Sequence, residues 1–215
     1  STQMQKVRGG KIGMIFQEPM TSLDPVKTIG YQLMESILLH HKCSKAEAEE
    51  KAAELLSDVG IPDAKSRLND YPHQFSGGMR QRIMIAIAIS GDPEIIVADE
   101  PTTALDVTTQ AQILDLLSDI SKKRGTALLI VTHNLGIVAR YAQRIYVMYA
   151  GNVVESGKAE DIFAKPCHPY TRGLLKAVPR LDDSRERRLI PIEGTPINPA
   201  NRPKGCPFAN RCRYH

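Results

Sequence analysis

The sequence predicts an α/β fold with a parallel sheet, an inserted helical subdomain and an irregular C-terminal extension. The first observation is that three short apolar runs, "EIIVAD", "ALLIVT" and "RIYVMY", alternate with helix-like segments such as residues 109–122. This alternation is typical of parallel strands covered by helices. The second observation is a long helical pattern ahead of these runs, and the third is a proline-rich end from Pro166 onward.

The first predicted strand is "KIGMIF", residues 11–16, which has the continuous apolar character of a buried strand. The following "QEPMTSLDP" contains two prolines and several turn residues, so a loop leaves this strand at Gln17. An all-helical insert then runs from residue 29 to about residue 71. Within it, Ser44 and Glu47 have the spacing of a capping box, and Gly60 predicts the end of the same helix.

The next predicted helix is "GGMRQRIMIAIAISG", which is apolar on nearly every side after its first turn. A helix of this kind lies inside a protein, and Gly91 predicts its end. We therefore expect a core formed by residues 1–25 and 90–165, a helical subdomain with this helix at residues 26–89, and an extension at residues 166–215.

The composition limits the class of protein. A chain of 215 residues, 42% of them hydrophobic, can bury a core and fits one large domain or one domain with an appendage. Its longest uninterrupted apolar run, Ile83 to Ile89, is much shorter than the roughly 20 residues that span a bilayer. The first ten residues hold no apolar signal core, and the four cysteines do not resemble a secreted disulfide framework. A reducing, cytoplasmic setting is therefore expected.

The formal net charge of +4 is concentrated at the C-terminal end. Residues 180–215 hold eight Lys or Arg and four Asp or Glu, and this difference of four equals the net charge of the whole chain. Residues 1–179 are therefore neutral overall, which argues against a main domain that binds nucleic-acid phosphates. The basic extension is expected to be a solvated surface rather than a nucleic-acid site.

Polar side chains follow three of the predicted strands. Gln17 follows the first, Asp99 and Glu100 end the second, and Thr132 and His133 follow the third. In parallel sheets covered by helices, functional residues usually lie at the carboxyl ends of the strands. We therefore expect these side chains at one edge of the sheet. A carboxylate such as Asp99 suits Mg²⁺, Glu100 suits the orientation of a water, and His133 suits contact with a transferring phosphate. Taken singly, the acids are better explained as turn caps and the histidine as a core residue.

The segment "FSGGMRQR" places Ser76, Gly77 and Gly78 at the start of the predicted buried helix. The backbone N–H groups and the positive end of the helix dipole at such a start point toward an anion. Paired glycines also form ordinary turns, so the order along the chain matters more than the pair. That order is a strand-end glutamine, Ser-Gly-Gly, a strand ending in Asp-Glu, "ALD", and a strand ending in Thr-His.

With this order, the sequence resembles the nucleotide-binding subunits of ABC transporters, which have a P-loop NTPase core. "FSGGMRQR" is similar to their signature motif, "IIVADE" to the Walker B strand with its catalytic glutamate, and "TALD" to the D-loop. The resemblance implies that Glu100 is catalytic and that His133, the switch histidine, assists it. It also implies that Asp99 and the Q-loop glutamine Gln17 bind Mg²⁺. The nucleotide contacts implied are Gln17, Ser76, Gly77, Gly78, Gln81 and Asp106.

Several segments narrow the resemblance to the ATPases of dipeptide and oligopeptide permeases, a branch that also serves nickel uptake. They are "FQEPMTSLDP", "DEPTTALDVTTQAQIL", "HPYTRGLLKAVP" and "GCPFANRC". The branch implies an ATPase at the cytoplasmic face of the membrane, with ATP and Mg²⁺ bound between two subunits that close head to tail. The implied partners are a second ATPase subunit, transmembrane permease subunits and, indirectly, an extracytoplasmic substrate-binding protein, whereas nucleic acid is not expected.

The family's Walker A loop, G-x-x-x-x-G-K-[ST], does not occur in these residues. That loop supplies the lysine on the β- and γ-phosphates and a hydroxyl of the Mg²⁺ shell. We therefore expect the chain to be an internal piece of a protein of about 300 residues or more, and to bind ATP weakly and be inactive as it stands. Two alternatives are a non-catalytic nucleotide-binding or regulatory module that has lost the loop, and an ABC ATPase of DNA repair or translation.

Cys206 and Cys212 lie in a proline-punctuated segment, where two thiols in a reducing setting are metal ligands or bystanders. Several relatives in the resembling branch hold a four-iron four-sulfur cluster there, using a further cysteine that here would fall beyond His215. The resemblance thus implies an iron–sulfur cluster in the full-length protein. Cys167 is a distant candidate for another ligand, because such clusters bind four thiolates.

Overall fold

The computed structural model describes residues 2–18, 22–103, 105–177, 191–197 and 203–215. It divides the chain into two compact units, residues 1–133 and residues 134–215. No helix within the described ranges combines the length and the apolar character that crossing a membrane requires. The domain boundaries drawn from the sequence remain predictions.

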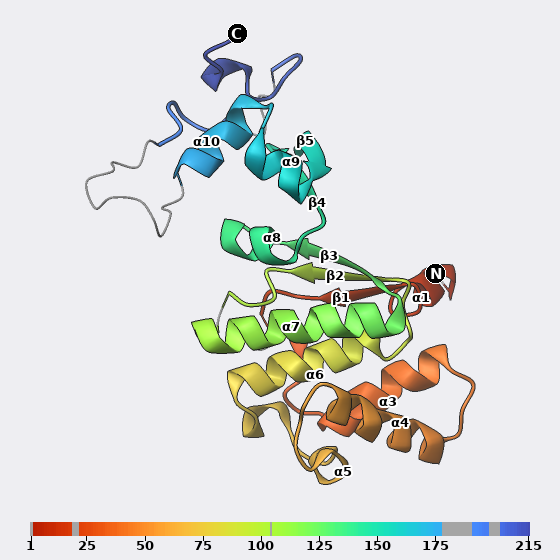
Figure 1. Ribbon diagram of the computed structural model, residues 1–215. Helices are drawn as coiled ribbons and strands as arrows, with labels where there is room; N and C mark the ends of the chain where they lie inside the picture. The colour runs from red at the N-terminus through yellow and green to blue at the C-terminus, as the bar shows by residue number, and fades with distance from the viewer. Residues whose placement is uncertain (1, 19–21, 104, 178–190, 198–202) are drawn as a thin grey trace. The chain divides into compact units, whose positions relative to one another are not determined.

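The first unit contains a three-stranded parallel sheet in the order β1-β2-β3 (Figure 1). The strands are β1 (Ile12–Ile15), β2 (Ile95–Asp99) and β3 (Ala127–Val131). The register pairs Ile15 with Ala98 on one side of β2 and Asp99 with Val131 on the other. The carboxyl ends of the three strands therefore meet at one edge of the sheet, as the apolar runs predicted.

Two long helices cover one face of this sheet. Helix α6 (Gly77–Ile89) packs against β1, helix α7 (Val107–Arg124) packs against β3, and the two helices contact each other (Figure 1). In α6, Ile83, Ile85 and Ile89 are fully buried, so the prediction of an internal helix is confirmed. The helix ends with Ser90 as its C-cap, immediately before the predicted Gly91.

The burial of β1 differs from the prediction that this strand is buried. Side chains alternate between the two faces of a strand, and in β1 Ile15 is buried whereas Ile12 and Met14 are 41% and 44% exposed. The first strand is therefore buried on one face only, the face that α6 covers, and not on both faces as its continuous apolar run suggested.

The residues between β1 and α6 form helices, as predicted. They are α3 (Ile29–His40), α4 (Lys45–Asp58), α5 (Ala64–Arg67) and the 3₁₀ turn η1 (Pro72–Gln74), and a short helix α1 (Thr2–Val7) precedes β1. The capping box is present at α4, where the Ser44 amide donates to Glu47 Oε2 at 2.7 Å and the Glu47 amide donates to Ser44 Oγ at 3.3 Å. Gly60 follows this helix with a φ of 78°, a conformation that glycine adopts without strain.

One hydrophobic core joins the sheet to the helical insert. It contains Ile15 and Ile96 from the strands, Ile85 from α6, and Leu33 and Leu56 from α3 and α4. All five side chains are fully buried, so α6 is packed on one side by the sheet and on the other by the insert.

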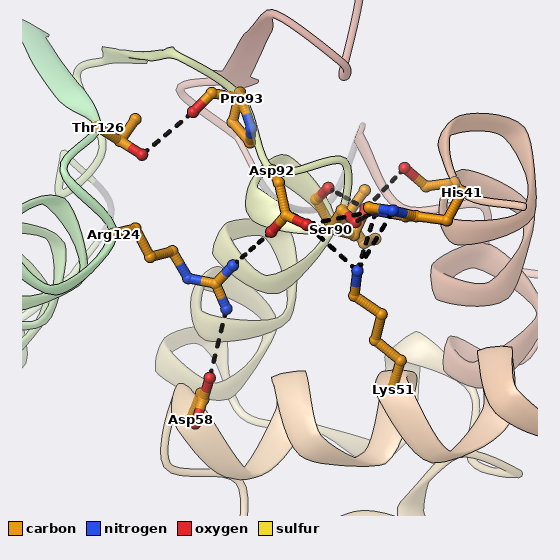
Figure 2. Close-up of polar contacts among 10 residues, drawn as sticks. His41, Lys51, Asp58, Ser90, Asp92, Pro93, Arg124 and Thr126 are labelled. Atoms are coloured by element: carbon orange, nitrogen blue, oxygen red, sulfur yellow. Dashed lines mark hydrogen bonds and ion pairs between the residues drawn. The ribbon is translucent and has the colours of Figure 1, made fainter. Parts of the chain in front are cut away.

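A network of polar contacts adds a second connection between the insert and the sheet (Figure 2). Asp92, in the turn before β2, accepts from Arg124 of α7 at 2.8 Å and from Lys51 of α4 at 3.2 Å. Arg124 also donates to Asp58 at the end of α4, at 3.4 Å, and His41 lies 3.6 Å from Asp92 Oδ2. The network ties the amino-terminal end of β2, away from the strand ends that carry the predicted site, to α4 and α7.

The described part of the second unit contains a two-stranded antiparallel sheet and three α-helices. Its elements are α8 (Leu135–Tyr141), β4 (Arg144–Tyr149), β5 (Asn152–Lys158), α9 (Ala159–Ala164), α10 (Pro169–Ala177) and the 3₁₀ turn η2 (Ala209–Arg211). The prediction that "RIYVMY" is a further parallel strand is wrong, because Tyr149 pairs antiparallel with Asn152. Ala150 and Gly151 between them have φ angles of 49° and 77°, which form a tight hairpin turn.

The C-terminal residues are packed against this unit. The Phe208 ring lies 5.2 Å from that of Tyr149 and 5.5 Å from that of Tyr170, and Arg211 donates to the carbonyl oxygens of Ile192 and Glu193 at 2.8 Å each. The predicted extension is thus helical in α10 rather than irregular throughout. Residues 178–190 and 198–202, which hold most of its arginines, lie outside the described residues.

Candidate active site

Glu100 lies at the centre of the predicted site. Its Oε1 lies 2.6 Å from His133 Nδ1, and its Oε2 accepts hydrogen bonds from Gln17 Nε2 at 3.2 Å and from Thr103 Oγ1 at 2.7 Å. Gln17 follows β1, Glu100 follows β2 and His133 lies two residues after β3. The structure therefore brings these three strand-end residues together, as the parallel sheet predicted.

The backbone at Glu100 adopts an uncommon conformation. Its φ angle is 44°, in the left-handed region that few residues other than glycine occupy. The Glu100 amide donates to the Val131 carbonyl oxygen at 2.9 Å, and the Thr103 amide donates to the Glu100 carbonyl oxygen at 3.3 Å. These two hydrogen bonds hold the residue in the conformation that directs its side chain toward the neighbouring strand ends.

Hydrogen bonding keeps the Glu100 carboxylate ionised. The hydrogen bond with His133 is the largest influence that lowers the pKa of Glu100, and the Thr103 hydroxyl lowers it further. An ionised carboxylate only accepts hydrogen bonds, so the proton between the two groups belongs to Nδ1 of His133. The His133 side chain is 77% exposed, so the Nε2 side of its ring is accessible to an incoming group.

Asp99 ends β2 immediately before Glu100, and Gln17, which follows β1, donates from its side-chain amide to Glu100. Carboxylate and amide oxygens are ligands that Mg²⁺ accepts, so the donor set fits this ion. Among the described residues, no three His, Cys, Asp or Glu side chains gather into a metal site. A partial protein shell is what Mg²⁺ ordinarily uses, since it keeps several waters and binds through substrate phosphates.

A cavity lies at the start of α6. Ser76 is the N-cap, and its hydroxyl oxygen accepts from the Met79 amide at 3.3 Å. Beside it is an open cavity of about 420 Å³, between the first turns of α6 and α7. Its lining consists of Ser76, Gly77, Gly78, Met79, Arg82, Leu105, Asp106, Thr109 and Gln112. The structure therefore brings together the predicted Ser-Gly-Gly segment and Asp106.

The two glycines differ in what surrounds them. A methyl group added at Gly78 would lie 2.9 Å from Thr109 Cγ2, whereas one added at Gly77 would have its nearest neighbour, Leu105 Cδ2, at 3.9 Å. Glycine at position 78 thus allows the close approach of α6 to α7. Glycine at position 77 leaves the mouth of the cavity open.

Asp106 is the N-cap of α7. Its carboxylate accepts from the Thr109 hydroxyl at 2.6 Å, from the Thr109 amide at 3.0 Å and from the Thr108 amide at 3.1 Å. These hydrogen bonds lower the pKa of Asp106, the Thr109 hydroxyl most strongly, so the carboxylate stays ionised at the mouth of the cavity. Ala104 of the predicted "TALD" segment lies outside the described residues.

These observations are matched by comparisons with known proteins. The model of the ABC transporter family matches residues 1–103, and the model of the C-terminal region of oligopeptide/dipeptide transporters matches residues 154–215. This chain belongs to the ABC transporter family. Its α/β fold with a parallel sheet is the fold of the P-loop ABC ATPase core.

Two curated relatives come from Bacillus subtilis (strain 168). The oligopeptide transport ATP-binding protein OppD is 53% identical over 212 residues, which are 99% of this chain and 59% of the relative. The dipeptide transport ATP-binding protein DppD is 55% identical over 210 residues, 98% of this chain and 62% of the relative. The ABC transporter chain described here therefore spans about three fifths of the length of these relatives.

A solved structure supports the same fold. It is the dimeric structure of a post-hydrolysis state of an ATP-binding cassette bound to ADP and phosphate, 31% identical with a TM-score of 0.63. The match covers 73% of this chain and 66% of that chain.

Gln81, which the resemblance to the family assigned to nucleotide binding, is not at the cavity. It is 1% exposed inside α6, and its Nε2 has no partner among the described residues. The reason is that α6 is enclosed on nearly all sides from its second turn onward. Arg82 lines the cavity instead, with Nη1 donating to the Val59 carbonyl oxygen at 2.7 Å and Nη2 to Gln112 Oε1 at 3.4 Å.

Two further residues of this ABC transporter chain were not predicted. Thr103 donates to Glu100. Thr109 donates from its hydroxyl to Asp106, and its methyl group lies next to Gly78. A hydroxyl residue three positions after a functional acid is a signal for both threonines, because that spacing suits a turn or a cap. No comparable signal exists for Arg82, because only the packing of α6 decides which side of the helix stays open.

The cysteines of the described C-terminal segment do not form a metal-binding cluster. Cys167, Cys206 and Cys212 are all free thiols. Cys206 Sγ lies 3.9 Å from His168 Nε2, and no third metal-binding side chain joins them within the described residues.

Proposed function

We propose that this chain is the ATP-binding and ATP-hydrolysing part of a subunit that powers an ABC importer of dipeptides or oligopeptides. The observation that carries the proposal is the contact of Glu100 with both Gln17 and His133 at the ends of three parallel strands. The names of the two Bacillus relatives favour peptides over nickel as the cargo.

Glu100 orients the attacking water in the proposed reaction and accepts its proton. It is suited to this role because its carboxylate is ionised and accepts hydrogen bonds from neighbouring side chains. His133 faces the γ-phosphate with Nε2, and a proton on this nitrogen, in addition to the one on Nδ1, would donate to the charge that builds up there. Bound Mg²⁺ would neutralise phosphate charge, and Asp99 and Gln17 are the residues that would hold it.

The start of α6 binds the nucleotide of a partner subunit in this proposal. The backbone amides of Gly77 and Gly78 and the helix dipole attract a phosphate to the cavity, whose open side suits a ligand brought by another chain. Asp106 at the same mouth carries a negative charge, so it serves subunit contact or accepts from a bridging donor rather than binding phosphate directly. The dimeric state of the related cassette supports this arrangement.

The proposed partners are a second ATPase subunit, identical or paralogous, and transmembrane permease subunits. The subunit then lies at the cytoplasmic face of the membrane. Gln17 supports the coupling, because it joins Glu100 to the loop that leads into the helical insert. An extracytoplasmic substrate-binding protein, which acts indirectly, stays a prediction from the family resemblance.

The iron–sulfur cluster has no support in the described residues. A four-iron cluster binds four thiolates, whereas within the part of the chain that the structure describes no three His, Cys, Asp or Glu side chains gather around Cys206 or Cys212. The residues present do not fit the cluster, so no part of the proposed function depends on it.

Two alternative functions make different predictions. A non-catalytic module binds nucleotide without turnover, and an ATPase of DNA repair or translation hydrolyses ATP without a permease. The match of residues 154–215 to the C-terminal region of peptide transporters favours transport over the second alternative.

The test is reconstitution of the full-length protein with its permease subunits in proteoliposomes. We expect hydrolysis of Mg-ATP that rises when a peptide-loaded binding protein is supplied, together with peptide uptake. Hydrolysis without uptake would favour the non-transport ATPase, and nucleotide binding with no hydrolysis would favour the regulatory module.

A further inference from the structure

The Glu100 carboxylate has a third partner besides Gln17 and His133. Thr103 Oγ1 donates to Glu100 Oε2 at 2.7 Å, which is shorter than the 3.2 Å of the bond from Gln17 to the same oxygen. A hydroxyl donor to an ionised carboxylate forms a charge-assisted hydrogen bond, which is among the stronger polar contacts in proteins. The threonine is exposed, so this contact and not core burial distinguishes its side chain.

The three partners differ in where they come from. Gln17 and His133 lie on separate loops after β1 and β3, and both are assigned contacts with nucleotide or its cation in the proposed function. Thr103 lies in the same turn as Glu100, where its amide also donates to the Glu100 carbonyl oxygen at 3.3 Å. The Thr103 contact therefore moves with Glu100 when the neighbouring loops rearrange.

We propose that Thr103 is a positioning residue for Glu100, whose hydroxyl holds Oε2 in place when Gln17 and His133 turn to the nucleotide. The proposal rests on the proposed ATPase function. Thr103 transfers no proton and touches no reacting atom. Its effect is to keep the glutamate side chain, which has three rotatable bonds, in the orientation that addresses the water, because misplacement of a catalytic group lowers the rate.

A structural role for the same threonine predicts a different outcome. The Thr103 hydroxyl also lies 3.3 Å from the Glu100 carbonyl oxygen, so it also stabilises the turn. If the turn were its only function, loss of the hydroxyl would lower stability and nucleotide binding together. Positioning of the carboxylate affects the chemical step instead, which separates kcat from KM.

The experiment compares Thr103→Val, which keeps the shape and removes the hydroxyl, with Thr103→Ser, which keeps the hydroxyl, in the full-length protein. Thr103→Ala repeats the loss with a smaller side chain. Thr195→Val, at an exposed threonine of the second unit, is the control for the same chemical change elsewhere. The measurements are kcat and KM for Mg-ATP, and the melting temperature.

We expect Thr103→Val and Thr103→Ala to lower kcat about tenfold or more, with KM and melting temperature close to the parental values. Thr103→Ser should stay within about twofold of the parental kcat. Parental kcat in both variants that lack the hydroxyl, or an equal loss in Thr103→Ser, would overturn the positioning role alone. A parental protein that binds but does not hydrolyse ATP would overturn the proposed function and this inference with it.

Discussion

Glu100 Oε1 lies 2.6 Å from His133 Nδ1, and this contact joins the end of β2 to the end of β3. Both residues follow strands of one parallel sheet, in which Asp99 pairs with Val131. The strand register therefore fixes how close the acid and the imidazole come, and the hydrogen bond fixes which ring nitrogen carries the proton.

The first prediction concerns the catalytic acid. In the full-length protein, Glu100→Gln should lower the rate of ATP hydrolysis by about 100-fold or more, because an amide cannot accept the proton of the attacking water. Nucleotide binding should be retained, since the amide remains small and polar. Phosphate release and calorimetric titration measure the two quantities. Glu94→Gln, at an exposed acid just before β2, is the control. If Glu100→Gln hydrolysed ATP as fast as this control variant, the role given to Glu100 would be excluded.

The second prediction separates the two glycines of α6. Both substitutions, Gly77→Ala and Gly78→Ala, gain the same helix propensity, but only the second places a methyl group 2.9 Å from Thr109 Cγ2. Gly78→Ala should therefore be less stable than Gly77→Ala by about 1–3 kcal/mol in the free energy of unfolding.

A second substitution checks the cause of that difference. Thr109→Ser removes the crowded methyl group and keeps the hydroxyl that binds Asp106, so it should restore most of the stability lost in Gly78→Ala. Thr109→Ser alone supplies the reference. If urea unfolding gives the two alanine variants equal stability, α6 and α7 do not approach as closely as described.

The third prediction concerns the network around Asp92. Asp92→Asn keeps a residue that tolerates the left-handed φ of 52° but removes the charge that faces Arg124 and Lys51. We expect a loss of about 0.5–1 kcal/mol in the free energy of unfolding, because the aspartate is 53% exposed and its pairs are screened.

The stability loss in Asp92→Asn is checked by varying the ionic strength and by comparison with a variant that removes another exposed ion pair. The loss should shrink as ionic strength rises, since screening weakens exposed pairs. Glu94→Gln removes the Lys11–Glu94 pair, in which the glutamate is 71% exposed, and should change stability by about zero. Equal losses in the two variants at low salt would argue against a network effect.

The fourth prediction concerns the pH dependence of the second unit. Burial raises the pKa of Glu155, but the nearby Thr171 hydroxyl and the hydrogen bonds from the amides of Cys167 and His168 outweigh it and lower the pKa below its ordinary value of 4.5. A carboxyl group with a depressed folded-state pKa contributes stability above its unfolded pKa and loses it as pH falls through the folded value.

Glu155→Gln should therefore be less stable than the parental protein near neutral pH. The difference should stay constant down to about pH 5 and then shrink as pH falls below about 4.5. Denaturant unfolding monitored across this range measures it, with Glu160→Gln of α9 as the control for removal of a charge. A difference that grows toward acid pH would have the wrong sign for this account.

The local elements of this protein were determined by the sequence alone. The capping box at Ser44 and Glu47, the stop at Gly60 and the internal position of α6 each follow from short-range patterns. The order of Gln17, Glu100 and His133 after three successive apolar strands likewise predicted that they would meet, because the carboxyl ends of parallel strands share an edge.

Only the tertiary structure decided which helices and strands contact one another. "RIYVMY" reads as a strand, but the tight turn at Ala150 and Gly151 and its partner β5 made it antiparallel. Gln81 and Arg82 are adjacent in one motif, and the packing of α6 buried the first and left the second at the cavity. Periodicity specifies which face of an element is apolar, whereas the partner that covers that face depends on chain segments far away in the sequence.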